Sequence, residues 1–205
     1  MSGNFTQRGE PTLLDKWQRT QAALENGVDL VVELPIFMAV QPAHRFATGA
    51  LELLASLGVD DVVFGAEHPE WNFSQLVAAE QDFSASSFSR FNATYATQFN
   101  EQLQKQTGVS LIDPNDILAF GYYKAQIKEN LPLRLHPIKR RGSQYHDEQI
   151  NGKIASASAV RQAVLEQDDF SQAVPAATAR YLQQIQQVPD WNALYPMLRN
   201  QLIQT

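Results

Sequence analysis

The stretch Asp29-Leu-Val-Val-Glu-Leu-Pro35, together with Asp60-Asp-Val-Val-Phe-Gly-Ala-Glu67, decides the fold predicted for this chain of 205 residues. Each apolar run is too short and too continuous for an amphipathic helix, and its valine, leucine and phenylalanine residues favour strands. We therefore predict two buried parallel strands. In open α/β sheets ligands bind beyond the carboxyl ends of the strands, so residues 33–35 and 65–67 are the first places to look for a site.

A helix is predicted between the two strands, which makes a βαβ unit. Pro42 suits its first turn and Gly58 suits its C-terminal cap. A glycine at position 65 also suits a tight strand exit that binds no ligand. The apolar residues of the helix recur at steps of three and four positions, and they are Phe46, Ala50, Leu53, Leu54 and Leu57.

Composition narrows the classes of function. The chain has a net charge of −6, a pI near 5.2 and no cysteine. Disulfides and thiolate metal sites are therefore excluded, and a nucleic-acid footprint over the whole surface is not expected. No uninterrupted apolar run approaches the roughly 20 residues of a membrane-spanning helix, and no signal pattern opens the chain. We expect a cytosolic protein that is not bound to a membrane.

The remaining sequence predicts more helices and one more strand. A helix should run from Thr12 to Gly27 with Asp15 as a capping-box partner. Asp113 should cap the helix that Pro114 begins, by accepting amide hydrogen bonds. The apolar stripe of the first helix should contain Leu13, Trp17 and Leu24. Further helical patterns cover 73–83, 88–106, 114–130, 156–167, 175–187 and 191–203, and a strand pattern covers 133–138.

Two groups of residues are candidates for binding phosphate. Lys16 and Arg19, one helical turn apart, could form a cluster with Arg8, although charged helix residues are commonly only solvated. Ser156 and Ser158 suit a helix N-terminus, whose free amides favour an anion, and Arg161 could pair with that anion. A plain serine cap with a solvated arginine explains the same pattern.

Several kinds of chemistry have no support in the sequence. There is no Gly-x-Ser-x-Gly elbow, no P-loop and no cysteine nucleophile. The histidines lack a close metal-ligand spacing, so no metal site is predicted from His44, His68, His136 and His146. What remains is a parallel α/β sheet with arginine and backbone groups at its strand exits, which describes a binder of nucleotide phosphates without a covalent nucleophile.

The order and spacing of several segments closely resemble the bacterial tRNA(Met) cytidine acetate ligase family of the nucleotidyltransferase superfamily. These segments are 1–11, 15–17, 27–35, 64–67, 114–115, 145–147 and 156–161. The resemblance implies a Rossmann-like parallel sheet of the nucleotidyltransferase type, with its first strand missing here and with helices at the C-terminal end. It also implies that ATP, with Mg²⁺, activates acetate to acetyl-adenylate with loss of pyrophosphate. The acetyl group then passes to the 4-amino group of the wobble cytidine in elongator tRNA(Met).

The resemblance also assigns roles to individual residues. It implies that Gly65 lets the backbone approach ATP, that Asn115 hydrogen-bonds the nucleotide and that Arg140 contacts it at a strand exit. It further implies that Ser156, Ser158 and Arg161 hold phosphate. Additional candidate ligands are Arg8, Lys16, Arg19, Arg141 and His146. The family tends to have glycine at position 119 and an apolar residue at 141, where this chain has alanine and arginine, so the ligand could be Arg140 or Arg141.

The sequence also departs from the family by what it does not contain. No His-x-Gly-His occurs in the 205 residues. We therefore expect an ATP-binding core over 1–168 that is incomplete at its N-terminus, the start of a helical domain over 169–205, and an inactive partial form of the ligase. The alternatives are a nucleotide-binding remnant without catalysis, or a nucleotidyltransferase that makes a small adenylylated cofactor.

Overall fold

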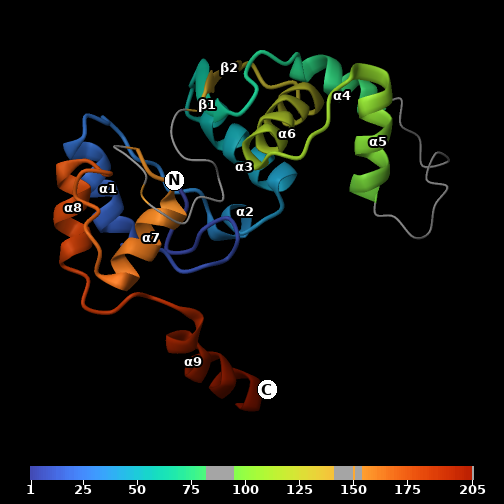
Figure 1. The fold of residues 1–205 in the computed structure, drawn as a ribbon. Coiled ribbons are helices and arrows are strands. Elements are labelled where there is room, and N and C mark those ends of the chain that lie inside the picture. Colours follow the sequence, from blue (N-terminus) through green and yellow to red (C-terminus); the bar gives the residue numbers. More distant parts are fainter. Residues whose placement is uncertain (82–94, 141–149, 151–153, 205) are drawn as a thin grey trace. The chain divides into compact units, whose positions relative to one another are not determined.

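The computed structural model describes residues 1–81, 95–140, 150 and 154–204. The chain divides into two compact units (Figure 1). We call residues 42–140 the sheet unit, and residues 1–41 with 141–205 the terminal unit. The predicted boundary at 168 does not coincide with this division, and it stays a prediction.

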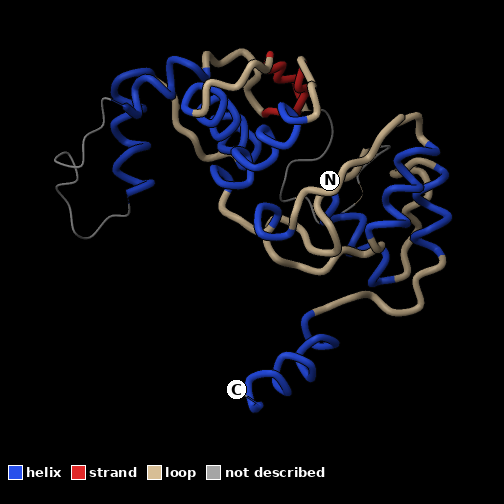
Figure 2. The backbone as a smooth tube through the Cα atoms, turned by 180° about the vertical axis from the view of Figure 1, so that it is seen from behind, coloured by secondary structure: helices blue, strands red, loops and turns tan. Residues whose placement is uncertain are grey.

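The sheet unit is built on two parallel strands. β1 (Asp61–Ala66) pairs with β2 (Arg134–Lys139), in a register that runs from Asp61 opposite Arg134 to Ala66 opposite Lys139. Figure 2 shows the two strands, coloured red, side by side. Both lie where the sequence predicts them, and the predicted α/β class with a parallel sheet is confirmed. The helices of this unit are α3 (Ala43–Ser56), α4 (Phe73–Gln81), α5 (Tyr95–Thr107) and α6 (Pro114–Lys128).

Helices α3 and α6 cover one face of the strands. Leu51 of α3, Ala125 of α6 and Leu133 before β2 form a buried cluster there. The ring of Phe64 in β1 packs on Tyr122 of α6 with centroids 4.9 Å apart, and burial raises the pKa of Tyr122 to about 12. The apolar contacts on this face fix α6 against the sheet, and they place its N-terminus near the strand exits.

The caps of α3 are those predicted, but its buried face is not. Pro42 precedes the helix, and Gly58 has a φ of 75°, which suits a glycine at the C-terminal end. Ala47 and Leu51 are fully buried, whereas Leu57 is 50% exposed. The predicted stripe is wrong by a rotation about the helix axis, because small residues let α6 approach closely. Gly121 of α6 faces this contact, since a Cβ there would lie 3.2 Å from the Cβ of Ala47.

The terminal unit is helical. Its helices are α1 (Lys16–Glu25), α2 (Ile36–Ala39), α7 (Ala157–Glu166), α8 (Ala176–Gln183) and α9 (Trp191–Gln204). Leu14, Val160 and Leu182 form its buried cluster. None of the helices in the described ranges has both the length and the apolar character that a bilayer span requires.

The strand predicted over 29–35 is wrong. Within the described residues, this stretch pairs only with the start of the chain, where Leu34 forms a parallel bridge with Ser2 and its N–H donates to the carbonyl of Met1 at 2.8 Å. Leu30 is 72% exposed. A strand needs a continuous ladder of hydrogen bonds, and a single bridge does not provide one.

Helix α1 begins later than predicted. Asp15 is its N-cap, and it forms a capping box with Gln18 through hydrogen bonds of 2.8 and 3.2 Å. Residues 12–14 therefore precede the helix, and buried Leu14 contributes to the core from outside it. Trp17 is 72% exposed and Leu24 is 38% exposed, so the predicted buried stripe is wrong for both. The Nζ of Lys16 lies 5.2 Å from the centroid of the Trp17 ring.

Candidate functional site

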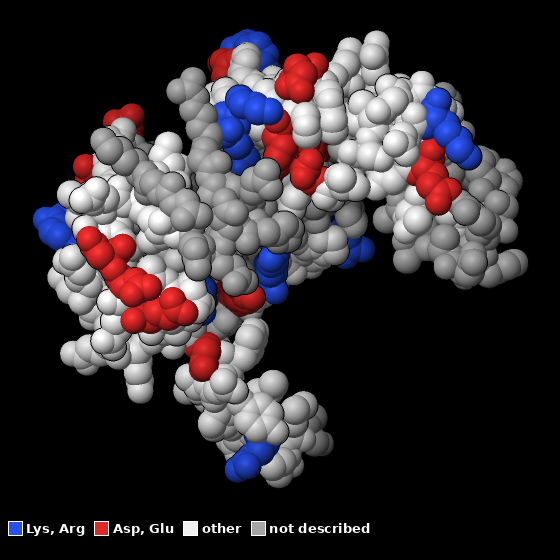
Figure 3. Space-filling model, in the orientation of Figure 1, with Lys and Arg blue, Asp and Glu red and all other residues white. Residues whose placement is uncertain are grey.

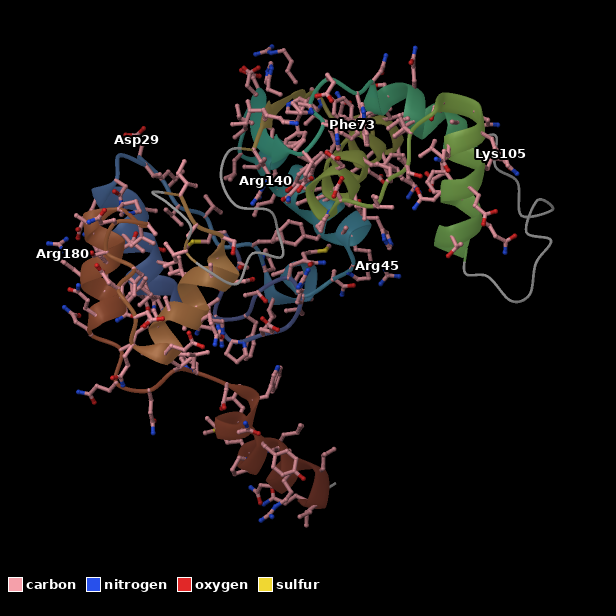
Figure 4. All side chains as sticks on the ribbon, in the orientation of Figure 1. Asp29, Arg45, Phe73, Lys105, Arg140 and Arg180 are labelled. Carbon is pink, nitrogen blue, oxygen red and sulfur yellow. The ribbon has the colours of Figure 1, made fainter. Side chains whose placement is uncertain are left out.

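The candidate site lies at the carboxyl ends of β1 and β2. The ladder continues past β2, because the N–H of Arg140 donates to the carbonyl of Ala66 at 3.0 Å. A Cβ added to Gly65 would lie 2.9 Å from the Cγ of Arg140. Gly65 therefore leaves room for the aliphatic part of Arg140 to lie across the strand exit (Figure 4 labels Arg140).

Asn115 links the two strand exits. Its Nδ2 donates to Oε1 of Glu67 at 2.5 Å, and its Oδ1 accepts from Nη1 of Arg140 at 3.1 Å. The amide is thereby held in one orientation. Within the described residues, the other N–H groups of the Arg140 guanidinium have no acceptor and can serve a ligand. The structure thus brings together three predicted residues: Gly65, Asn115 and Arg140.

Glu67 holds the first turn of α6 in place. Its Oε2 accepts from the backbone N–H of Asp116 at 2.9 Å, and its carbonyl accepts from Nζ of Lys139. Asp113 is at the N-cap position, as predicted, but its side chain accepts no hydrogen bond from an amide of the helix, so the predicted capping contact is wrong. The carboxylate of Glu67, directly after β1, takes this role. Its negative charge is stabilised at the N-terminal end of the helix dipole, and it also fixes Asn115.

A second pair of residues extends the network. Asp116 is completely buried, and its carboxylate accepts from the backbone N–H of His68 at 2.9 Å and from Nδ1 of His68 at 2.6 Å. The imidazole stacks on the indole of Trp71, with ring centroids 4.2 Å apart and planes inclined by 6°. The buried carboxylate and the indole together fix the position of the ring.

One group of described residues could hold a metal ion. His68, Asp113 and Asp116 each offer a ligand atom, and these atoms lie within 4.8 Å of one another. The distance of 2.6 Å between His68 and Asp116 is that of a hydrogen bond, so a metal would have to displace the shared proton. Mg²⁺ prefers oxygen ligands and is commonly bound together with substrate phosphates. The protein atoms alone do not form such a site.

The phosphate candidates of α7 lie in the terminal unit. Ser156 is the N-cap, as predicted, and its Oγ accepts from the N–H of Ala159 at 2.9 Å, while Ser158 is exposed. Arg161 donates to the carbonyls of Pro11 at 3.0 Å and Pro189 at 2.8 Å. Arg161 thus connects two segments of the terminal unit that are far apart in sequence. Its contact with phosphate stays a prediction.

The basic candidates near α1 also have protein partners. Lys16 forms an ion pair with Glu33 at 2.7 Å, and Arg19 donates to the carbonyls of Ser2, at 2.6 Å, and Gly3. Burial lowers the pKa of Arg19. These contacts hold the loop at the start of the chain against α1. Arg8 is exposed in that loop, whereas Arg141 and His146 lie outside the described residues.

Sequence reasoning missed the roles of Glu67, His68 and Asp116. His68 and Asp116 are 48 positions apart, so no local pattern connects them. The available signals were a glutamate two residues after the strand-exit glycine and an acidic residue in the first turn of a helix. Neither signal shows that the two segments share hydrogen bonds.

The sequence model of a known family, the HIGH nucleotidyl transferases, matches residues 1–205. The chain belongs to the HIGH nucleotidyltransferase family. Two curated relatives of this HIGH nucleotidyltransferase are named tRNA(Met) cytidine acetate ligase. The protein from Limosilactobacillus reuteri is 66% identical over 204 residues, which are 100% of this chain and 54% of the relative. The protein from Limosilactobacillus fermentum is 59% identical over 205 residues, which are 100% of this chain and 55% of the relative.

The fold of this chain is also similar to solved structures. Thermotoga maritima TmcAL in its apo form is 31% identical, with a TM-score of 0.78 over 90% of this chain and 48% of that protein. The same protein bound with alpha-thio ATP is 32% identical, with a TM-score of 0.75 over 90% of this chain and 47% of that protein. The predicted resemblance and the fold class are confirmed. The HIGH nucleotidyltransferase chain spans about half the length of the relatives that it matches.

Proposed function

We propose that this chain provides the nucleotide-binding core of an ATP-dependent ligase of the tRNA(Met) cytidine acetate ligase type. In this reaction acetate attacks the α-phosphorus of ATP, which forms acetyl-adenylate and releases pyrophosphate. The 4-amino group of the wobble cytidine of elongator tRNA(Met) then takes the acetyl group and AMP leaves. The observation that carries the proposal is the convergence of Asn115 and Arg140 at Gly65, in a chain 32% identical to a protein solved with alpha-thio ATP.

The residues at the strand exits suit a role in binding and positioning. Arg140 is exposed and already oriented by Asn115, so its guanidinium can make charge-assisted bonds to an anionic ligand. Such a site accelerates a reaction by orienting the reactants and by stabilising charge that develops on phosphate oxygens. We include Mg²⁺ in the proposal as an ion that enters with the phosphates of ATP.

Acetate, tRNA and a cytoplasmic location are further parts of the proposal. On the face shown in Figure 3, acidic and basic side chains of the described residues are interspersed. With a net charge of −6, this chain has an excess of negative charge, which does not attract the phosphates of tRNA. We therefore assign ATP and acetate to this chain, and tRNA to the proposed whole enzyme.

We expect Arg140→Ala to weaken ATP binding by about one to two orders of magnitude. A hydrogen bond to a charged group contributes about 1.5–3 kcal/mol, and 1.4 kcal/mol corresponds to about tenfold. Isothermal titration calorimetry of MgATP measures the change. Arg134→Ala is the matched control, because Arg134 begins β2 and donates to the carboxylate of Asp61 at 2.7 and 2.5 Å. These hydrogen bonds hold the pKa of Asp61 well below its ordinary value. Equal dissociation constants for both variants would contradict the proposed site.

Gly65→Ala should weaken ATP binding through Arg140. The added Cβ would lie 2.9 Å from the Cγ of Arg140, so this side chain must move. We expect a loss of about tenfold in the wild-type background, because the guanidinium loses its orientation. In the Arg140→Ala background the same substitution should have little effect, which a double-mutant cycle measures by calorimetry. Additive losses would show that Gly65 acts on the ligand directly.

A second candidate function is nucleotide binding without catalysis. The observation that favours it is that the three residues brought together at the strand exits, Gly65, Asn115 and Arg140, suit binding and positioning, and none of these three is a nucleophile or a general base. Exchange of labelled pyrophosphate into ATP separates the two functions. Exchange that depends on acetate would support ligase chemistry in this chain, and ATP binding without exchange would support the second candidate.

A further inference from the structure

His68 is held on two sides by the protein. The carboxylate of Asp116 accepts from its backbone N–H at 2.9 Å and from its Nδ1 at 2.6 Å. Trp71 covers one face of its ring, with centroids 4.2 Å apart. The side chain nevertheless remains 35% exposed. Since Nδ1 bonds Asp116 and Trp71 stacks on one face, Nε2 is the ring nitrogen left for a ligand.

The partner on Nδ1 determines what Nε2 offers to a ligand. Asp116 accepts from the backbone N–H of His68 with one oxygen, and we assign the proton of the second contact to Nδ1, so that both oxygens accept. In a neutral ring Nε2 then has a free lone pair and acts as an acceptor. In the described part of the sheet unit, no side chain or backbone group donates to this nitrogen.

This acceptor belongs to the same network as the proposed ATP ligands. His68 directly follows Glu67, and the carboxylate of Glu67 bonds both Asn115 and the N–H of Asp116. Arg140, which bonds Asn115 in this network, has a guanidinium that only donates hydrogen bonds. A ligand suited to this edge therefore combines anionic or carbonyl oxygens with a group that donates a hydrogen bond. Nucleotides with an exocyclic amino group have both features.

We propose that Nε2 of His68 accepts a hydrogen bond from the exocyclic amino group of a nucleobase, and that it selects amino-bearing bases over their oxo analogues. This inference rests on the nucleotide site of the proposed function. Adenine and cytosine carry such a group, whereas hypoxanthine and uracil present an oxygen that would face the lone pair of Nε2. A site built to accept from a ligand N–H discriminates against an analogue that lacks it.

The test compares nucleotides that differ at this group. Binding of ATP, ITP, CTP and UTP is measured by calorimetry at pH 8, with wild-type protein and with His68→Asn. Asparagine retains a donor for Asp116 at the position of Nδ1 but has no atom at the position of Nε2. We expect about a tenfold preference for ATP over ITP if the base is adenine, or for CTP over UTP if it is cytosine. His68→Asn should reduce that ratio to about one.

His136→Asn is the matched control, since His136 lies in β2 and bonds Asp61 at 2.7 Å. It should leave the ratio unchanged. An equal ratio in wild type and His68→Asn would overturn the inference, as would a wild-type protein that binds amino and oxo nucleotides alike. Lack of binding of any nucleotide would overturn both this inference and the proposed function, whereas binding without discrimination overturns only the inference.

A second measurement uses only wild-type protein, so it does not require that a variant folds. In wild-type protein with ¹⁵N-labelled histidine, the resonance of an Nε2 that accepts a hydrogen bond shifts when the ligand binds. The His68 signal should move with ATP or CTP, and it should move less with the matching oxo nucleotide. Identical shifts with both members of each pair would contradict the proposal.

Discussion

Asp116→Ala should lower the free energy of unfolding by about 3 kcal/mol. Asp116 is completely buried, and it accepts two hydrogen bonds from His68, at 2.9 and 2.6 Å. Alanine would leave the backbone N–H of His68 without its acceptor and would remove a charge-assisted bond, and each loss costs about 1–3 kcal/mol. Chemical denaturation in urea measures the change.

Asp113→Ala is the control for Asp116. Both aspartates are at the start of α6, but the side chain of Asp113 is 42% exposed and accepts no hydrogen bond from a helix amide. Its Oδ2 lies 3.9 Å from Nδ1 of His68. Its replacement should change the stability by no more than about 0.5 kcal/mol. Equal effects of the two substitutions would show that the contact with His68 does not stabilise the sheet unit.

The sequence predicted those elements that have strong local signals. β1, β2, α3, α6 and α7 were predicted because apolar runs, Pro42, Pro114 and Ser156 mark them independently of the rest of the chain. The convergence of Gly65, Asn115 and Arg140 came from the resemblance, because their separation in sequence carries no geometric information. These two kinds of signal together pointed to the strand exits as the candidate site.

The wrong predictions have a common physical cause: in each case contacts with residues far away in the sequence determined the structure. The apolar run at 30–34 suits a strand, but the described residues provide only one bridge to it, at Leu34. Asp113 has the side chain and position of a cap, but Glu67, which directly follows β1, accepts the hydrogen bond from the N–H of Asp116 instead. The capping box at Asp15 starts α1 after Leu13, and the helix buries Ala22 while Trp17 is exposed. Burial and capping by a distant residue cannot be read from local spacing.

Arg161→Ala should lower the free energy of unfolding by about 2 kcal/mol. Arg161 donates to the carbonyls of Pro11 and Pro189, at 3.0 and 2.8 Å, and these residues lie 150 and 28 positions away. Hydrogen bonds from a charged donor contribute about 1.5–3 kcal/mol each, and partial exposure of the side chain reduces the sum. Thermal unfolding followed by circular dichroism should show a lower midpoint.

Arg180→Ala is the control for Arg161 in the same unit. Arg180 also bonds a distant residue, Glu25, but its side chain is 64% exposed, so we expect Arg180→Ala to lower the midpoint less than Arg161→Ala does. ATP titration of the Arg161 variant tests the separate phosphate role that the sequence predicts. A loss of about one to two orders of magnitude in affinity would support a phosphate contact. An unchanged dissociation constant, together with reduced stability, would show that Arg161 stabilises the fold and does not contact phosphate.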